Sequence, residues 1–263
     1  MAEHIPGKLH WEQHGKHGPV MFFVHGNPYD NRLWLYQTAH FSTWFRCVAV
    51  DLPAYGRSPA AQPGLRLGDM AQACLETLDE ITDEPVILVG NSVGASTITF
   101  MVGQRPQQTR AMIIVGAGYL PDRSFARMGG DPYREKGIAQ RQVQINRFVS
   151  PALEGTELAT YLVDMFLETN DRVDARGISE IFRALEEPEP EQIYDAIDVP
   201  CLIVAGTEDA TYKAAIALQQ RIKNAELQTI PGGRHVPNLD YPAQFDRHVL
   251  DFLKRHDLLP ALV

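Results

Sequence analysis

Short runs of apolar residues alternate with amphipathic segments along most of this 263-residue chain. The apolar runs are VMFFV, CVAV, VILV, AMIIV and CLIVA, which begin at residues 20, 47, 86, 111 and 201. A strand that is apolar at successive positions is buried on both faces, which is typical of parallel sheets covered by helices. The pattern therefore predicts an α/β fold with a mostly parallel, doubly wound sheet.

The alternation stops after Gly118 and resumes at Val199. Helical periodicity covers three segments between these points, at residues 133–149, 156–169 and 173–186. The sequence therefore predicts a core made of residues 1–118 and 198–263, with a helical cap insertion at residues 119–197 that lies over one end of the sheet.

Two segments near the N-terminus have the character of strands. They are KLHWEQHG at residues 8–15 and VMFFVHG at residues 20–26, and the turn KHGP joins them. Two such segments joined by a short turn with Gly are typical of a hairpin. We expect them to pair as an antiparallel hairpin.

The charge balance limits the classes of partner. Lysine and arginine number 24 against 33 aspartates and glutamates, which gives a formal net charge of −9, and the basic residues are scattered. Nucleic-acid-binding proteins carry a concentrated positive surface instead. No run of about 18 apolar residues indicates a membrane span, and the N-terminus lacks a signal-peptide pattern. We expect a cytoplasmic protein with a small-molecule substrate and no nucleic-acid or membrane partner.

Cysteines and histidines do not indicate a metal site. Cys47, Cys74 and Cys201 lie in apolar surroundings without a Cys-x-x-Cys spacing, so we expect buried free thiols in a reducing compartment. Five histidines fall within the first 25 residues, but their spacing matches no zinc motif. The sequence predicts neither a metal nor a cofactor.

The pentapeptide Gly90-Asn91-Ser92-Val93-Gly94 stands between a predicted strand and a predicted helix. In a nucleophile elbow, the strand-to-helix turn is so tight that the positions flanking the serine carry almost no side chain. The alternative is that a turn rich in small residues matches this frame by chance. The strand and helix on either side favour Ser92 as a nucleophile.

A serine hydroxyl needs a base to accept its proton, and the base needs an acid to orient it. Asp209 follows the glycine that ends one late strand, and His235 follows the next strand. The order Ser, Asp, His is that of a triad built on successive strand ends. Asp209 as a helix cap and His235 as an ordinary loop residue are the alternatives, and Glu208 is the rival acid.

Such a site also needs hydrogen-bond donors for a developing oxyanion. One is the backbone N–H of Val93, at the start of the helix that follows Ser92, where the helix dipole favours negative charge. The second is expected from the loop after the strand VMFFV, and the backbone N–H of Asn27 is our choice. We expect His25 to brace this loop by hydrogen bonding.

With these residues the chain resembles the α/β-hydrolase superfamily, in the serine-nucleophile branch that carries a helical cap. The matching stretches are HGNP at 25–28, DLPAYGRS at 51–58, GNSVG at 90–94, AGTED at 205–209 and GGRHVP at 232–237. The resemblance implies a catalytic triad of Ser92, Asp209 and His235, an oxyanion hole from Asn27 and Val93, and a pocket under the cap. Family spacing favours Asp209 over Glu208.

The resemblance specifies the fold more closely than it specifies the reaction. The loop HGNP is similar to that of haloalkane dehalogenases, but those enzymes use an aspartate where this chain has Ser92. Hydrolases of carbon–carbon bonds share GNS, yet the tryptophan that they tend to carry after the histidine is absent here. The cap residues that we expect to contact substrate are Phe125, Phe148, Met165 and Phe166. Arg123, Arg127 and Arg134 in the cap are candidates for holding a substrate carboxylate, but an ordinary solvated surface arginine is the favoured interpretation of each.

We therefore expect a carboxylesterase-like serine hydrolase that acts on a small, largely apolar ester, thioester, lactone or amide. A C–C bond hydrolase, or a cofactor-free lyase or oxygenase, would use the same triad. A ligand receptor on the same fold is the alternative outside enzymes. Cap residues at helical spacing are also compatible with cap packing alone.

Overall fold

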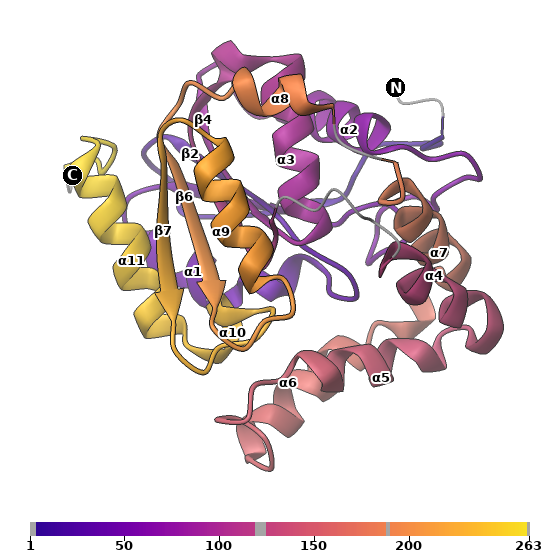
Figure 1. Cartoon of the computed structure of the whole chain (residues 1–263). Helices are drawn as coiled ribbons and strands as arrows, with labels where there is room; N and C mark the ends of the chain where they lie inside the picture. The colour runs from indigo at the N-terminus through magenta and orange to yellow at the C-terminus, as the bar shows by residue number, and fades with distance from the viewer. Residues whose placement is uncertain (1–3, 119–124, 188–189, 262–263) are drawn as a thin grey trace.

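The computed structural model describes residues 4–118, 125–187 and 190–261. Its sheet has seven strands in the order β1-β3-β2-β4-β5-β6-β7, and only β1 runs antiparallel to its neighbour. The strands are β1 (Trp11–His14), β2 (Val20–Val24), β3 (Arg46–Val50), β4 (Val86–Asn91), β5 (Thr109–Val115), β6 (Cys201–Gly206) and β7 (Ala225–Ile230). The predicted doubly wound α/β fold is confirmed (Figure 1).

The expected hairpin at the N-terminus is wrong. β1 pairs with β3, with Trp11 opposite Val50 and His14 opposite Cys47. β2 lies in the interior of the sheet and is paired in parallel with β3 on one side and β4 on the other. Both edges of β2 are therefore occupied, so β1 pairs with the remaining edge of β3.

Helices cover both faces of the sheet. The helices of the core are α1 (Leu35–Phe41), α2 (Leu67–Asp79), α3 (Val93–Gln104), α9 (Tyr212–Arg221), α10 (Pro237–Asp240) and α11 (Pro242–Arg255). Along β2, Phe22 belongs to the hydrophobic cluster under α2, α3 and α9, whereas Phe23 belongs to the cluster under α1 and α11. Since successive strand residues point to opposite faces, a run that is apolar throughout supplies both clusters.

Between β5 and β6, the described residues 125–187 and 190–200 form five further helices. They are α4 (Phe125–Lys136), α5 (Ala139–Phe148), α6 (Glu157–Leu167), α7 (Ala175–Ala184) and α8 (Glu191–Asp195). The single helix predicted over residues 133–149 is wrong, because the chain leaves α4 and starts α5 around Gly137, whose φ is 60°. A positive φ suits glycine and interrupts a right-handed helix. Short 3₁₀ helices are η1 (Asn31–Trp34), η2 (Pro106–Gln108) and η3 (Asn170–Arg172).

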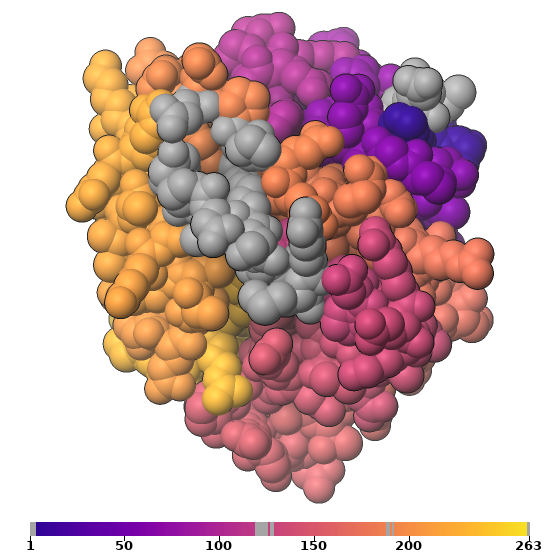
Figure 2. Space-filling view, turned by 45° about the vertical axis from the view of Figure 1, so that its right-hand side comes forward, coloured from indigo at the N-terminus to yellow at the C-terminus, as the bar shows by residue number. Residues whose placement is uncertain are grey.

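The inserted helices are not all in one place. α5 and α6 lie beyond the end of the sheet to which the arrowheads of β6 and β7 point, close to α10 (Figure 1). In the space-filling view, α4 to α6 form one end of the molecule (Figure 2). α8 instead packs against α3. The division of the chain into a core and a cap at residues 119–197 stays a prediction.

Two other properties bear on the expectations from the sequence. Cys47, Cys74 and Cys201 are buried free thiols. Across the described ranges, none of the helices combines the length and the apolar character that crossing a bilayer needs.

Candidate active site

Ser92 occupies the turn between β4 and α3 with φ 53° and ψ −117°. A non-glycine residue with positive φ is strained by roughly 1–3 kcal/mol, and such strain collects at functional sites. The surrounding structure must therefore hold Ser92 in this conformation. The Ser92 side chain is half-buried, at the carboxyl end of β4, where parallel sheets bind ligands.

The two flanking glycines are explained by close backbone packing. A Cβ atom at Gly90 would collide with the backbone of Gly94, and one at Gly94 would collide with the carbonyl groups of Val24 and His25. The elbow thus fits only between glycines, as the sequence pattern predicts.

His235 and Asp209 meet at the ends of two later strands. His235 Nδ1 lies 3.0 Å from Asp209 Oδ2 and 3.2 Å from Asp209 Oδ1. Because a carboxylate only accepts hydrogen bonds, the ring proton resides on Nδ1, and Nε2 is left as an acceptor. Both side chains are buried, with residue exposures of 9% and 8%.

The environment of Asp209 favours its ionised form. Burial by itself raises the pKa of the carboxyl group, but His235 and two hydrogen bonds from Thr211 outweigh it, and the pKa of Asp209 is lowered. The Thr211 donors are its backbone N–H, at 2.9 Å, and its hydroxyl, at 2.8 Å. The rival acid Glu208 is exposed. The geometry therefore favours Asp209 as the partner of His235.

Asn91, directly before Ser92, links the elbow to the His235 loop. Its Nδ2 donates to the backbone carbonyl of His235 at 3.0 Å, and a Cβ at Gly116 would collide with that same carbonyl. Among the described residues no hydrogen bond joins the Ser92 hydroxyl to the His235 ring. Catalytic hydrogen bonds are often long before substrate binds. The sequence analysis predicted no role for Asn91 or Gly116, although Asn91 is the middle letter of the motif GNS.

The loop that carries Asn27 packs against the elbow. A Cβ at Gly26 would lie 2.9 Å from the Cβ of Ser92, so only glycine allows this approach. Residues 26–29 form a turn closed by the Tyr29 N–H and the Gly26 carbonyl, at 2.9 Å. The buried Tyr55 hydroxyl donates to Asn27 Oδ1 at 2.9 Å. Opposite this loop, Val93 is the first residue of α3, so its N–H has no carbonyl partner within the helix.

His25 is fully buried behind the same loop. Its Nε2 accepts the backbone N–H of Leu52 at 2.9 Å, so its Nδ1–H donates to the Gly26 carbonyl at 3.1 Å. Burial lowers the pKa of His25 to about 4. His25 therefore braces the loop as a neutral ring.

This geometry predicts an acid-sensitive contribution to stability. The pKa of His25 is about 6.5 in the unfolded chain and about 4 in the folded chain, so the folded state binds fewer protons between these values. The contribution is complete above about pH 6.5 and is lost as pH falls towards 4, amounting to roughly 3 kcal/mol. His25→Gln keeps an acceptor without the titrating ring. Free energies of unfolding, measured from pH 7 to 4, should fall more steeply for the wild type than for this variant. Parallel curves would show that His25 does not titrate as described.

The helices between β5 and β6 bring aromatic side chains to the site. The Phe148 ring, at the end of α5, lies with its centroid 4.6 Å from that of His235. Phe166, on α6, is fully buried and meets Tyr29 edge to face, at 4.8 Å between centroids. Met165 is half-buried and packs on the same hydrophobic cluster. The side chain of Phe125 lies outside the described residues.

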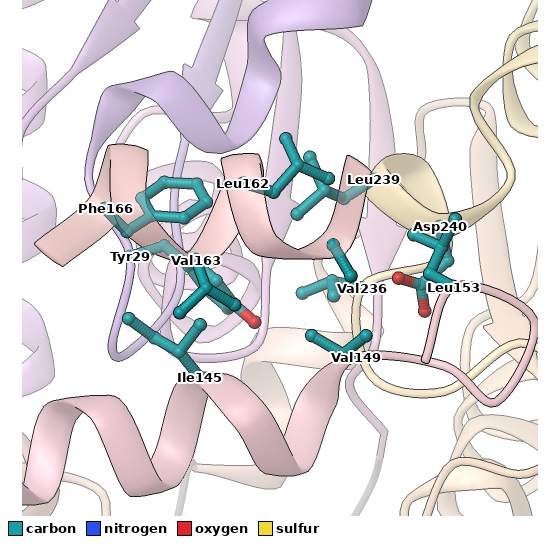
Figure 3. A pocket seen from close by; sticks show the side chains of 11 residues that line it. Tyr29, Ile145, Val149, Leu153, Leu162, Val163, Phe166, Val236, Leu239 and Asp240 are labelled. Atoms are coloured by element: carbon teal, nitrogen blue, oxygen red, sulfur yellow. The ribbon is translucent and has the colours of Figure 1, made fainter. Parts of the chain in front are cut away.

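A cavity of about 10 Å³ lies between α5, α6 and α10 (Figure 3). Its walls are apolar apart from Tyr29 and Asp240, and they include Ile145, Val149, Leu153, Leu162, Val163, Phe166, Val236 and Leu239. Burial raises the pKa of Asp240 to about 7. A space of this size holds about one water molecule.

The structure gives little support for a substrate-binding role of the three arginines named above. Arg134 is about half exposed and pairs with Asp131 at 3.5 Å. Arg123 and the side chain of Arg127 lie outside the described residues. Where the structure describes the chain, no group of three or more His, Cys, Asp or Glu side chains could hold a metal ion.

Comparisons with known proteins show the family and the fold. The model of the alpha/beta hydrolase family matches residues 21–247. The chain is 23% identical over 252 residues to the (E)-2-((N-methylformamido)methylene)succinate hydrolase of Acinetobacter baylyi, covering 93% of this chain and 94% of that protein. It is 25% identical over 229 residues to a pimeloyl-acyl-carrier-protein methyl ester esterase of Neisseria meningitidis, and the match covers 81% of this chain and 69% of that protein. The solved structure of the enol-lactonase from Burkholderia xenovorans has the same fold, with a TM-score of 0.84 at 20% identity. The match covers 95% of this chain and 98% of that chain.

Proposed function

The chain belongs to the alpha/beta hydrolase family, and from that premise we propose that it is a serine hydrolase of a small, largely apolar ester, thioester, lactone or amide. The single observation that carries the proposal is the hydrogen-bonded pair His235 and Asp209, attached through Asn91 to the strained elbow of Ser92. A strained serine, an oriented imidazole and a buried carboxylate are the groups that acyl transfer requires.

In the first half of the reaction, Ser92 Oγ attacks the acyl carbon while His235 Nε2 accepts the hydroxyl proton. Asp209 keeps the Nδ1 proton in place and stabilises the imidazolium ion. The carbonyl oxygen becomes an oxyanion, which the N–H groups of Val93 and Asn27 bind. His235 then protonates the leaving alcohol, thiol or amine, and the acyl group remains on Ser92.

In the second half, a water molecule replaces the leaving group. His235 Nε2 takes a proton from this water as it attacks the acyl carbon of the Ser92 ester. The same two N–H groups bind the second oxyanion. Collapse of this intermediate releases the carboxylic acid and returns the proton to Ser92 Oγ.

The apolar walls beside His235 support the substrate class. Phe148 lies against the His235 ring, and Val236 and Val149 line the cavity behind it. Side chains of this kind favour a hydrocarbon acyl group, which loses contact with water when it binds.

A substrate screen tests the proposal. Steady-state hydrolysis is measured with p-nitrophenyl esters from acetyl to octanoyl, then with aliphatic thioesters and lactones. Multiple turnovers on at least one of these classes are expected. One equivalent of bound ligand without turnover would indicate a receptor. If none of these classes turns over, a diketone is tested next, and turnover restricted to its carbon–carbon cleavage would move the activity to C–C hydrolysis.

Phe148 is expected to limit the length of the acyl group. Phe148→Ala removes the ring between His235 and Tyr29, so a longer chain gains access to the apolar walls. The ratio of kcat/KM for octanoyl over acetyl esters should rise about tenfold, the scale of a small change in a hydrophobic pocket.

The matched control is Leu158→Ala, because Leu158 is 43% exposed on α6. This variant should leave the ratio of octanoyl to acetyl kcat/KM as it is in the wild type. An equal loss on both esters in Phe148→Ala would mean that Phe148 acts through the position of His235 and does not select substrate.

A further inference from the structure

Arg141 on α5 is a fully buried arginine for which the mechanism above has no role. Its guanidinium lies between the turn that carries Asn27 and the segment at the end of α6. Burial of a charged group is costly unless the group is paired and hydrogen-bonded. The contacts of Arg141 therefore identify what it stabilises.

On the core side, Arg141 holds the turn of residues 26–29. Its Nε donates to the backbone carbonyl of Pro28 at 2.9 Å. Its guanidinium carbon lies 6.0 Å from the ring centre of Tyr55, whose hydroxyl binds Asn27 Oδ1. Arg141 thus binds Pro28, which follows Asn27 in the chain, and lies over the ring of Tyr55, which binds the Asn27 side chain.

On the other side, Arg141 holds the segment from the end of α6 to η3. Its Nη1 donates to the Phe166 carbonyl at 2.6 Å, to Thr169 Oγ1 at 3.1 Å and to Asn170 Oδ1 at 2.9 Å. These three acceptors lie within five residues of one another, so a single guanidinium group fixes the end of α6 relative to Pro28.

Asp30 balances the charge. Its Oδ2 lies 3.5 Å from Arg141 Nη2 and 2.7 Å from Arg32 Nη2. Thr169 Oγ1 also donates to Asp30 Oδ2, at 3.1 Å. Arg32 therefore shares Asp30 and Thr169 with Arg141, but Arg141 is the one that donates to Pro28. A substitution of Arg32 therefore disturbs Asp30 and Thr169 but leaves the hydrogen bond to Pro28 in place.

We propose that Arg141 is a positioning residue for the oxyanion hole, because it holds the Asn27 turn in register with the end of α6. The inference rests on the proposed function, in which the Asn27 N–H binds the oxyanion. An oxyanion donor acts only when it is aimed at the site where the charge develops. A displacement of about 1 Å at such a group lowers the rate roughly 10²-fold. The substrate ground state does not carry this charge, so its binding is less affected.

The test compares Arg141→Gln with the wild type, using p-nitrophenyl acetate and an alkyl trifluoromethyl ketone. The ketone adds to a serine as a tetrahedral hemiketal, and its oxyanion reports on the hole directly. Rates are normalised to the active sites titrated with a fluorophosphonate, so that loss of folded protein does not count. We expect kcat to fall about 10²-fold with KM within about threefold, and the Ki of the ketone to rise in parallel with the loss of kcat.

Two further variants keep the result interpretable. Arg141→Lys retains the charge beside Asp30 but loses the rigid planar fork that donates to the Pro28 and Phe166 carbonyls, so its kcat should lie between those of the wild type and Arg141→Gln. Arg32→Gln removes the other partner of Asp30 and Thr169 and should leave the Ki near the wild-type value. Melting temperatures are measured for all three.

Two outcomes would overturn the inference. The first is an unchanged Ki in both Arg141→Gln and Arg141→Lys. The second is an equal rise of Ki in Arg32→Gln, which would assign the effect to the Asp30 network as a whole. Failure of the proposed function is a separate result, because the wild type itself would then neither hydrolyse the ester nor titrate with the fluorophosphonate.

Discussion

Ser92→Ala is expected to lower kcat for p-nitrophenyl esters about 10⁶-fold, the scale seen when the nucleophile of a triad is removed. The reason is that the hydroxyl of Ser92 is the atom that forms the acyl-enzyme, and His235 and Asp209 act only through it. Alanine keeps the Cβ in the strained elbow, so the backbone at φ 53° is held by the same neighbours. The folded state should therefore survive, with a melting temperature near that of the wild type.

Ser96→Ala is the matched control for this prediction. Ser96 follows Ser92 by one helical turn in α3 and is also half-buried. It should retain the wild-type kcat. The activity that remains after loss of a nucleophile is far below a thousandth of the wild-type rate. A Ser92→Ala variant that keeps more than about a thousandth of that rate would therefore mean that another group attacks the ester.

Asp209→Asn is expected to lower kcat about 10⁴-fold, the loss that follows when the imidazole takes the wrong tautomer. An amide at this position can donate to His235 Nδ1, so the ring proton moves to Nε2 and the base is blocked. The loss of charge also removes the stabilisation of the imidazolium ion that forms during attack. The Thr211 N–H, which donates to Asp209 Oδ1, can keep its bond to an amide oxygen, and the Thr211 hydroxyl beside Oδ2 can accept from the amide NH2.

Glu208→Gln separates the two neighbouring acids. Glu208 is exposed and has no hydrogen bond to His235 in the described structure, so its replacement should change kcat by less than about twofold, as for an ordinary surface position. Full activity in Asp209→Asn together with loss of activity in Glu208→Gln would show that the acid has been assigned to the wrong residue.

The elements that follow from local pattern could be predicted from the sequence. The strand runs are apolar at every position because both faces are covered, and the elbow needs two glycines because of its own backbone. The pairing of β1 could not be predicted in this way, since it depends on which strand edge remains free after β2 is enclosed. Local turn residues between two strands carry no information about that competition.

Contacts between segments far apart in the chain could not be predicted from the sequence either. Arg141 stands in the polar stretch AQRQVQINR, where nothing separates it from a solvated arginine, yet the fold buries it against Pro28. Asn91 is visible in the elbow motif, but its hydrogen bond to the His235 carbonyl joins residues 144 positions apart. Such contacts form only once the ends of several strands have been brought together by the sheet.

Reaction with a fluorophosphonate, followed by peptide mapping with mass spectrometry, tests most directly whether Ser92 is a covalent nucleophile activated by His235. We expect one adduct per chain, on the peptide that contains Ser92, with labelling abolished in Ser92→Ala and slowed by orders of magnitude in His235→Ala. Stoichiometric labelling of any other residue, or an undiminished rate of labelling in His235→Ala, would contradict it.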